Sequence, residues 1–258
     1  MKKVYLVLMS MLLVLGLASI GLCANTLIAA YTFDNDPANG VKDVTGNGHT
    51  GIIKDAKYVD GKFGKGLEFD GTKSMVEIAS KDDLNMKGGA ITVEAWVKPS
   101  KYNDLSAVVQ KWGDNTNRRQ YLLCFVGDKL SFYISGKGNT WPAASGKTVV
   151  KAGEWTHIAG TYDSKTIKAY VNGKLDAETA NTEGIFASDV PAWIGGYGGA
   201  DDKDFGSNRH FPGVIDEVHY WSGVLTDKEI QAGMVGSVSP VDLMGKLTTN
   251  WGSIKTQN

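Results

Sequence analysis

The dominant pattern along the chain is an alternation of apolar and polar residues with a period of two. Over 91–98 the residues Ile, Val, Ala and Val occupy every second position, and the same spacing recurs over 130–135 and 167–171. Such alternation places one set of side chains in a core and the other set outside, which predicts β-strands. Similar runs predict further strands at 27–33, 66–69, 75–78, 106–111, 120–126, 155–162, 192–195 and 213–221.

Turn signals separate these runs. Asn172-Gly173 is the strongest short-range signal for a β-hairpin, and Asp70-Gly71 marks a second turn. The chain has 32 Gly but 6 Pro, and many glycines favour many tight turns with positive φ. Many short strands joined by turns are typical of an antiparallel sandwich or barrel, and no βαβ pattern appears.

One helix is expected, over 226–235. Thr226 is a suitable N-cap, and Glu229 three residues later completes a capping box. Leu225 before the cap and Ile230 after it have the spacing of a hydrophobic staple. The fold class expected from these patterns is therefore all-β, with one short C-terminal helix.

The first 24 residues predict a secretory signal peptide. Two lysines precede an apolar run over 4–22, and the small residues Cys23 and Ala24 follow it. We expect cleavage near Ala24 and a secreted, extracytoplasmic protein without a membrane span, in keeping with a bacterial exported protein. A retained membrane anchor is one alternative, because the run is long enough to span a bilayer. A lipoprotein attached at Cys23 is another, although Leu22 is too bulky for a lipobox.

Residues 25–236 are expected to form one domain, followed by a tail over 237–258. The tail has apolar residues at near-helical spacing among glycines, threonines and asparagines. Two interpretations stay open, a partly ordered tail and a segment that docks on a partner or on the domain. Without residues 1–24 the chain loses two lysines, which changes its formal net charge from −1 to −3. No basic stripe indicates a nucleic-acid partner. Cys124 is then the only cysteine, so no internal disulfide is expected, and its apolar neighbours indicate a buried, inert thiol.

A set of segments occurs in a specific order along the chain: 30–34, 43–51, 66–71, 91–99, 154–163, 169–174 and 211–220, the last leading into 225–230. Together they resemble the laminin-G-like, concanavalin A-like lectin/glucanase family of jelly-roll domains, and the resemblance covers about residues 26–235. Each segment alone is weak evidence for this family, but their joint presence in this order is strong evidence. The resemblance implies two antiparallel sheets packed face to face, with the first and last strands as neighbours.

The resemblance also implies a structural calcium ion at the rim of the sandwich. Asp34 ends the first predicted strand, Asp43 and Asn47 lie in the polar loop after it, and Asp216 lies in the last strand. Ca²⁺ takes six to eight oxygen ligands, which carboxylates, amide oxygens and backbone carbonyls supply. In the alternative interpretation, Asp43 and Asn47 are turn residues that bond the backbone, and Asp216 is a sheet-edge carboxylate that also bonds the backbone. The four histidines lack the paired spacing of transition-metal ligands.

Catalysis is not expected. Glycoside hydrolases of this fold, such as laminarinases, place two carboxylates on one strand face in a Glu-x-Asp-x-(x)-Glu pattern, and no such spacing occurs here. Asp216 and Glu217 are adjacent, so in a regular strand they point to opposite faces. Glu94 is alone on its strand face. A glycosidase of the same fold is therefore the third hypothesis.

Binding is the expected function, and the candidate ligand-binding residues lie in loops: Trp112, Asn115, Arg118, Trp141 and Tyr197. Sugar recognition needs flat aromatic rings beside polar groups, and these loops carry both. Packing against the sandwich edge is the alternative for each aromatic residue. Two hypotheses stay open, a module that binds a glycan or glycoprotein and a protein-interaction or adhesion module attached to a surface.

Overall fold

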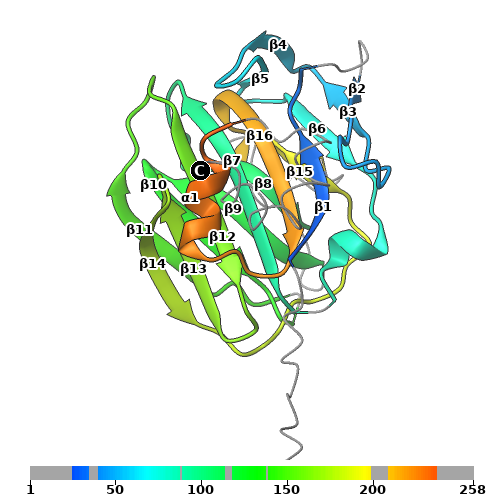
Figure 1. Ribbon diagram of the computed structural model, residues 1–258, viewed down its shortest axis with the longest axis vertical. Coiled ribbons are helices and arrows are strands. Elements are labelled where there is room, and N and C mark those ends of the chain that lie inside the picture. Colours follow the sequence, from blue (N-terminus) through cyan, green and yellow to red (C-terminus); the bar gives the residue numbers. More distant parts are fainter. Residues whose placement is uncertain are drawn as a thin grey trace, which may run out of the picture.

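The computed structural model (Figure 1) describes residues 25–34, 40–87, 89–113, 118–137, 139–198 and 209–236. The predicted signal peptide at 1–24 and the tail at 237–258 lie outside these described residues. Within them, no helix is long and apolar enough to cross a membrane. The described chain forms two antiparallel sheets, one short 3-10 helix, η1 (Asp82–Asn85), and one α-helix, α1 (Asp227–Gly233).

The first sheet, named sheet A here, has eight strands in the order β14-β13-β12-β7-β16-β5-β4, with β1 also paired to β16. The expected neighbourhood of the first and last strands is thus confirmed. The strands of sheet A are β1 (Thr26–Tyr31), β4 (Lys57–Asp60), β5 (Lys65–Asp70), β7 (Ile91–Pro99), β12 (Thr156–Tyr162), β13 (Thr166–Val171), β14 (Lys174–Ala180) and β16 (Pro212–Ser222).

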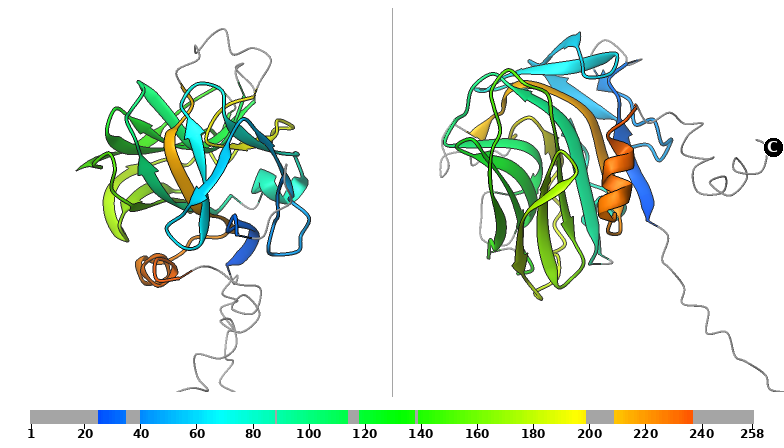
Figure 2. Two further views of the ribbon diagram at one scale, coloured as in Figure 1. Left: turned by 90° about the horizontal axis from the view of Figure 1, so that it is seen from above. Right: turned by 60° about the vertical axis from the view of Figure 1, so that its left-hand side comes forward.

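The second sheet, named sheet B, also has eight strands, in the order β11-β10-β9-β8-β15-β6-β3-β2. Figure 2 shows the two sheets stacked as layers, with α1 on the outside of sheet A. The predicted all-β jelly-roll sandwich is confirmed. The strands of sheet B are β2 (Gly40–Val41), β3 (Gly51–Lys54), β6 (Met75–Ile78), β8 (Leu105–Trp112), β9 (Arg119–Val126), β10 (Lys129–Ile134), β11 (Ala143–Val149) and β15 (Ala192–Ile194).

The core lies between the two sheets and is built by the period of two. The alternate residues of β7, at 91, 93, 95 and 97, are fully buried in one cluster with the alternate residues of β9, at 121, 123 and 125. The layers are in close contact at Gly160 of β12, where an added Cβ would lie 2.4 Å from the ring of Phe132 in β10. Only a residue without a side chain fits this position at the native spacing of the sheets.

The predicted hairpin and helix cap are both present. Asn172 and Gly173 join β13 to β14 with φ of 48° and 70°, the two positive values of a type I′ turn. The Thr226 hydroxyl accepts a hydrogen bond from the backbone N–H of Glu229, whose carboxylate in turn accepts the N–H of Thr226. Helix α1 packs Ile230 against sheet A.

The strands that the hydrophobic pattern missed lie at or next to sheet edges. These are β3, β4, β11 and β14, which expose many of their residues, and β2, which has only two residues. An edge strand buries little surface, so its sequence need not alternate. Asp176 of β14 protects one such edge, because its carboxylate accepts the backbone N–H groups of Lys147 (3.0 Å) and Thr148 (3.1 Å) in β11.

Candidate functional site

The predicted ligand-binding residues differ widely in their exposure to solvent. Trp141 is 57% exposed, whereas Trp112 and Tyr197 are only 4% and 6% exposed. The side chain of Arg118 is 41% exposed and pairs with Asp189 at 3.3 Å. Asn115 lies outside the described residues.

An apolar cluster occupies the outer face of sheet B, away from the core. In β9 the residues at 121, 123 and 125 point inward, so Leu122 and Cys124 point outward. They pack with Ala107 and Trp112 of β8, and Tyr133 of β10 lies against them. We call these five residues the outer-face cluster. Burial raises the pKa of the Cys124 thiol, so the expected inert thiol agrees with its position.

Trp141 reaches this cluster through Arg119. The guanidinium carbon of Arg119 lies 4.9 Å from the ring centroid of Trp141 and 5.7 Å from that of Trp112. The Trp112 ring meets Tyr133 edge to face at 6.1 Å. A cation between two indole rings holds both rings in place through cation–π attraction. The exposed ring of Trp141 therefore packs on Arg119 and faces solvent at this end of sheet B.

Arg119 was not among the candidates chosen from the sequence. Its position directly after Arg118, at the start of a strand, was the available signal. Tyr197 belongs to a neighbouring cluster instead, where its ring lies 5.1 Å from that of Trp193. The contacts thus join Trp112 and Trp141 through Arg119, whereas Arg118 pairs with Asp189.

Of the predicted calcium ligands, Asp43 and Asn47 act as turn residues. Asp43 Oδ1 accepts hydrogen bonds from the backbone N–H groups of Ala30 and Thr45 and from the Thr45 hydroxyl, and Oδ2 accepts the N–H of His49. The amide nitrogen of Asn47 donates to the carbonyl oxygen of Ile28 at 2.8 Å. These contacts are those of the alternative interpretation weighed from the sequence.

Asp34 and Asp216 converge on one turn, between β4 and β5. Asp34 Oδ1 accepts the N–H of Lys65 at 2.8 Å, and Asp216 Oδ2 accepts those of Lys62 (2.8 Å) and Phe63 (3.0 Å). Burial raises the pKa of Asp216 to about 7, although the hydrogen bond from Phe63 opposes the rise. Across the described ranges, no group of three or more His, Cys, Asp or Glu side chains is arranged to hold a metal. Asp34 and Asp216 therefore bond the same turn, whereas Asp43 and Asn47 bond the backbone of β1 and of the loop that follows it.

A charged network lies on the outer face of sheet A. His219 Nδ1 lies 3.1 Å from Glu94 Oε1, and its Nε2 lies 3.2 Å from Glu217 Oε2. The sequence argument that Asp216 and Glu217 point to opposite faces fails here, because β16 is not regular. Its register shifts between Asp216 and His219, and Glu217 has φ of 49°. This bulge lies where β16 changes its partner from β5 to β1.

The Glu94 and Glu217 carboxylates do not form an accessible catalytic pair. Both side chains are buried, and each is bonded to the same histidine. The indole N–H of Trp221 also donates to Glu94 Oε1 at 3.1 Å. A glycosidase needs carboxylates that face a sugar in a cleft, whereas these two face each other across His219.

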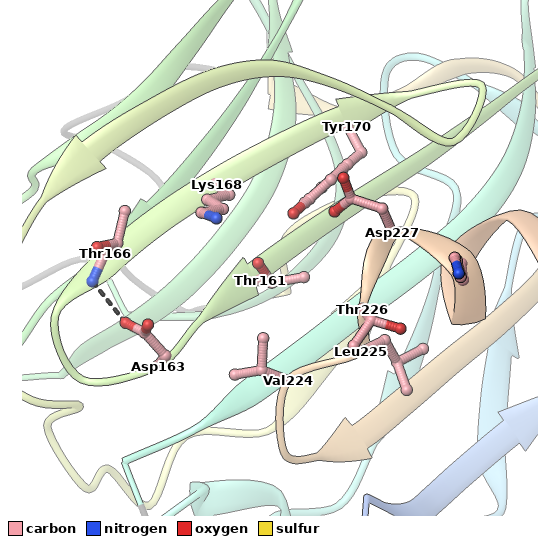
Figure 3. A pocket seen from close by; sticks show the side chains of 10 residues that line it. Thr161, Asp163, Thr166, Lys168, Tyr170, Val224, Leu225, Thr226 and Asp227 are labelled. Atoms are coloured by element: carbon pink, nitrogen blue, oxygen red, sulfur yellow. Dashed lines mark hydrogen bonds between the residues drawn. The ribbon is translucent and has the colours of Figure 1, made fainter.

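A separate cleft of about 450 Å³ lies beside α1, on the outer side of sheet A (Figure 3). Thr161 and Lys168 point into it from β12 and β13, and Tyr170 faces Asp227 at one end. Burial and the neighbouring Asp227 carboxylate raise the pKa of Tyr170 to about 12. The lining mixes lysines with carboxylates and offers no exposed ring face, so this cleft lacks the aromatic surface of the Trp141 site.

The two antiparallel sheets packed face to face define the protein as a jelly-roll sandwich. A family model for the concanavalin A-like lectin/glucanases superfamily matches residues 70–231, which is more than half of the chain, and the protein belongs to this superfamily. Mouse pentraxin-related protein PTX3 is 27% identical over 182 residues, covering 67% of this chain and 45% of that protein.

Solved structures share the fold at low identity. Domain 4 of AbnA, an extracellular GH43 arabinanase from Geobacillus stearothermophilus, in complex with arabinotriose, is 23% identical with a TM-score of 0.61 and covers 81% of this chain and 98% of its own. The binding domain of Paraclostridial Mosquitocidal Protein 1 is 15% identical with a TM-score of 0.65, covering 80% and 51%. The binding domain of botulinum neurotoxin DC, in complex with SialylT, is 12% identical with a TM-score of 0.59, covering 80% and 50%. The chain thus spans about half the length of PTX3 and of the two toxin chains.

Proposed function

We propose that the protein is a non-catalytic, extracytoplasmic module that binds carbohydrate or a glycoconjugate on the outer face of sheet B. The observation that carries the proposal is Trp141, an indole more than half exposed and held against the guanidinium of Arg119. A sugar ring presents C–H groups on one face, which pack on an aromatic face, and hydroxyls at its rim, which hydrogen-bond to polar neighbours. Because Trp141 is already stacked, little side-chain freedom is lost when a sugar binds.

Two further observations support this proposal. The buried carboxylates Glu94 and Glu217 are bonded to His219, which favours binding over catalysis. Among proteins of the same fold, the AbnA domain was solved with arabinotriose and the neurotoxin domain with SialylT. A saccharide ligand for this chain is consistent with those complexes.

A protein partner is the second candidate, and a small apolar surface favours it. Val126 and Val149 are exposed and both pair with Lys129, at the end of sheet B away from Trp141. Exposed apolar residues that lie side by side are a feature of interaction surfaces, and a protein partner would cover these two valines. Binding that depends on these valines and not on Trp141 would identify an adhesion module.

We also propose that a structural Ca²⁺ ion binds at the turn between β4 and β5. Asp34 and Asp216 are the two predicted ligands that meet there, and a buried carboxylate such as Asp216 is stabilised by a nearby cation. Backbone carbonyls of the turn are the kind of oxygen that would complete such a site. Secretion by the predicted signal peptide is proposed on the sequence pattern of residues 1–24 alone.

The test is a glycan array probed with the purified protein and with two variants. Trp141→Ala removes the exposed indole, and Ile52→Ala removes an apolar side chain of similar exposure, 59%, from β3 at the other end of sheet B. Loss of a stacked ring costs about 1–3 kcal/mol, so we expect affinity to fall by about tenfold or more in the first variant and to stay unchanged in the second. Equal binding by all three proteins would contradict a site at Trp141. An unchanged thermal midpoint in both variants shows that the fold is intact.

A further inference from the structure

A polar contact joins the loop that carries Trp141 to a second loop. The hydroxyl of Thr140, the residue before Trp141, donates to Glu183 Oε2 at 2.7 Å. Lys137 Nζ lies 2.9 Å from the other carboxylate oxygen, Oε1. The two loops also pack closely, since a Cβ added at Gly136 would collide with Glu183. The Glu183 carboxylate is therefore held next to the residue that carries the exposed indole.

Glu183 and Lys137 both keep hydrogen-bonding capacity for a ligand. A carboxylate offers about four acceptor sites, and Thr140 and Lys137 occupy two of them. An ammonium group has three N–H donors, and the carboxylate takes one of those of Lys137. The side chains of Glu183 and Lys137 are 27% and 66% exposed, so both reach solvent. Hydrogen bonds from Lys137 and Thr140 lower the pKa of Glu183, so its carboxylate is charged at neutral pH.

Adjacent hydroxyls of a sugar match this neighbouring acceptor and donor. A hydroxyl both donates and accepts, so one hydroxyl can donate to Glu183 while the next accepts from Lys137. Hydrogen bonds to an ionised group are shorter and roughly twice as strong as those between neutral groups. Because Thr140 holds the carboxylate beside the indole, a sugar ring stacked on Trp141 would direct its rim hydroxyls toward Glu183.

The positive charges described near Trp141 are already neutralised or buried. Arg118 pairs with Asp189, and Lys137 pairs with Glu183. Arg119 lies against the indole and is only 7% exposed. An acidic substituent on the sugar would moreover meet the carboxylate of Glu183, and like charges in contact disfavour binding. The arrangement therefore favours a ligand without a charge of its own.

We propose that Glu183, together with Lys137, determines the specificity of the Trp141 site, and that the ligand is a neutral saccharide with adjacent free hydroxyls. The sugar ring stacks on the indole, one hydroxyl donates to Glu183, and its neighbour accepts from Lys137. This inference rests on the proposed function and names its ligand class.

The experiment is an array in which each neutral saccharide lies beside two modified forms. Neutral gluco-, galacto- and manno-oligosaccharides are printed with the matching uronates, which carry a carboxylate at C6, and with their O-methylated forms, whose oxygens cannot donate. We expect the wild-type protein to bind the neutral member about tenfold more tightly than either modified form, because hydrogen bonds to a charged group are lost or a like charge is added. Trp141-dependent binding that is equally tight for a modified form would overturn the inference and leave the proposed function standing.

Two variants test whether the preference comes from Glu183. Glu183→Gln removes the charge at nearly constant shape and is expected to weaken binding of the neutral members by about fivefold or more, with the O-methylated forms unaffected. Glu154→Gln removes the same charge from an exposed pair with Lys151, beyond the far end of β11, and should change neither. A Glu183→Gln protein that binds neutral members as tightly as the wild type would overturn the inference, and binding of no saccharide would overturn both proposals. The modified saccharides test the wild-type protein, so that comparison does not depend on the folding of a variant.

Discussion

Replacement of His219 by Gln tests the buried charge network of sheet A. Carboxylates accept hydrogen bonds and cannot donate them, so a histidine with both ring nitrogens against carboxylates carries two protons and a positive charge. Burial by itself would lower the pKa of His219. Hydrogen bonds to Glu217 and Glu94 outweigh burial and raise it from 6.5 to about 9. His157 Nε2 also faces Glu94, at 3.5 Å.

The raised pKa of His219 determines how the unfolding free energy changes with pH, both in sign and in size. The folded pKa lies above the unfolded one, so the stabilisation is complete below about pH 6.5 and is lost as pH rises to about 9. At 1.36 kcal/mol per pKa unit, the loss is about 3 kcal/mol of unfolding free energy. In the Gln variant one buried carboxylate loses its partner, which costs about 3–5 kcal/mol at pH 6.

Urea unfolding followed by tryptophan fluorescence, from pH 6 to pH 9.5, measures the effect. Burial lowers the pKa of Lys111 to about 8, so Lys111 also titrates over this range, in the wild type and in the variant alike. The quantity compared is therefore the difference in unfolding free energy between the two proteins, in which the contribution of Lys111 cancels. We expect this difference to shrink by about 3 kcal/mol across the range. His210→Gln is the control, since His210 Nδ1 faces the carbonyl oxygen of Ser74 and not a carboxylate. A difference for His219→Gln that stays constant with pH would refute the reasoning.

Three further predictions follow from single contacts. Gly160→Ala places a methyl group against Phe132 and is expected to cost about 1–3 kcal/mol in urea unfolding, whereas Gly236→Ala, whose Cβ would meet no atom within 4 Å, should cost little. Asp176→Ala removes the acceptor for two N–H groups of β11 and should lower the unfolding free energy by about 1 kcal/mol; an unchanged urea midpoint would argue against edge protection. Chelation of Ca²⁺ is expected to lower the thermal midpoint, because an ion bound to the native state stabilises it, and a midpoint that does not move would count against calcium.

Much of the fold is predictable because its signals are local. The alternation in β7 and β9 reports which side chains face the core, and Asn172-Gly173 adopts the positive φ values of its turn without help from distant residues. The capping box at Thr226 likewise joins residues three positions apart. Edge strands such as β14 escaped prediction, since they bury too little surface to need an alternating sequence.

The candidate site was predictable only in part. The residues Trp112, Arg118 and Trp141 were chosen from loop composition, and the structure places both of these indole rings against Arg119. Arg118 pairs with Asp189 instead, and Tyr197 packs elsewhere. Arg119 lay in the same predicted loop as Arg118 but was not chosen, and the structure places it at the start of β9. Its role depends on a ring 22 positions away, and no local pattern reports that contact.

By itself, the sequence determined the class of fold, the residues that face the core, the hairpin turn and the helix cap, because each depends on neighbours a few positions apart. Only the tertiary structure decided which distant groups meet. Asp216 bonds the N–H of Lys62 across 154 positions, and a bulge in β16 turns Glu217 toward His219. Strand order and register set these encounters, and both arise from packing the whole chain into two layers.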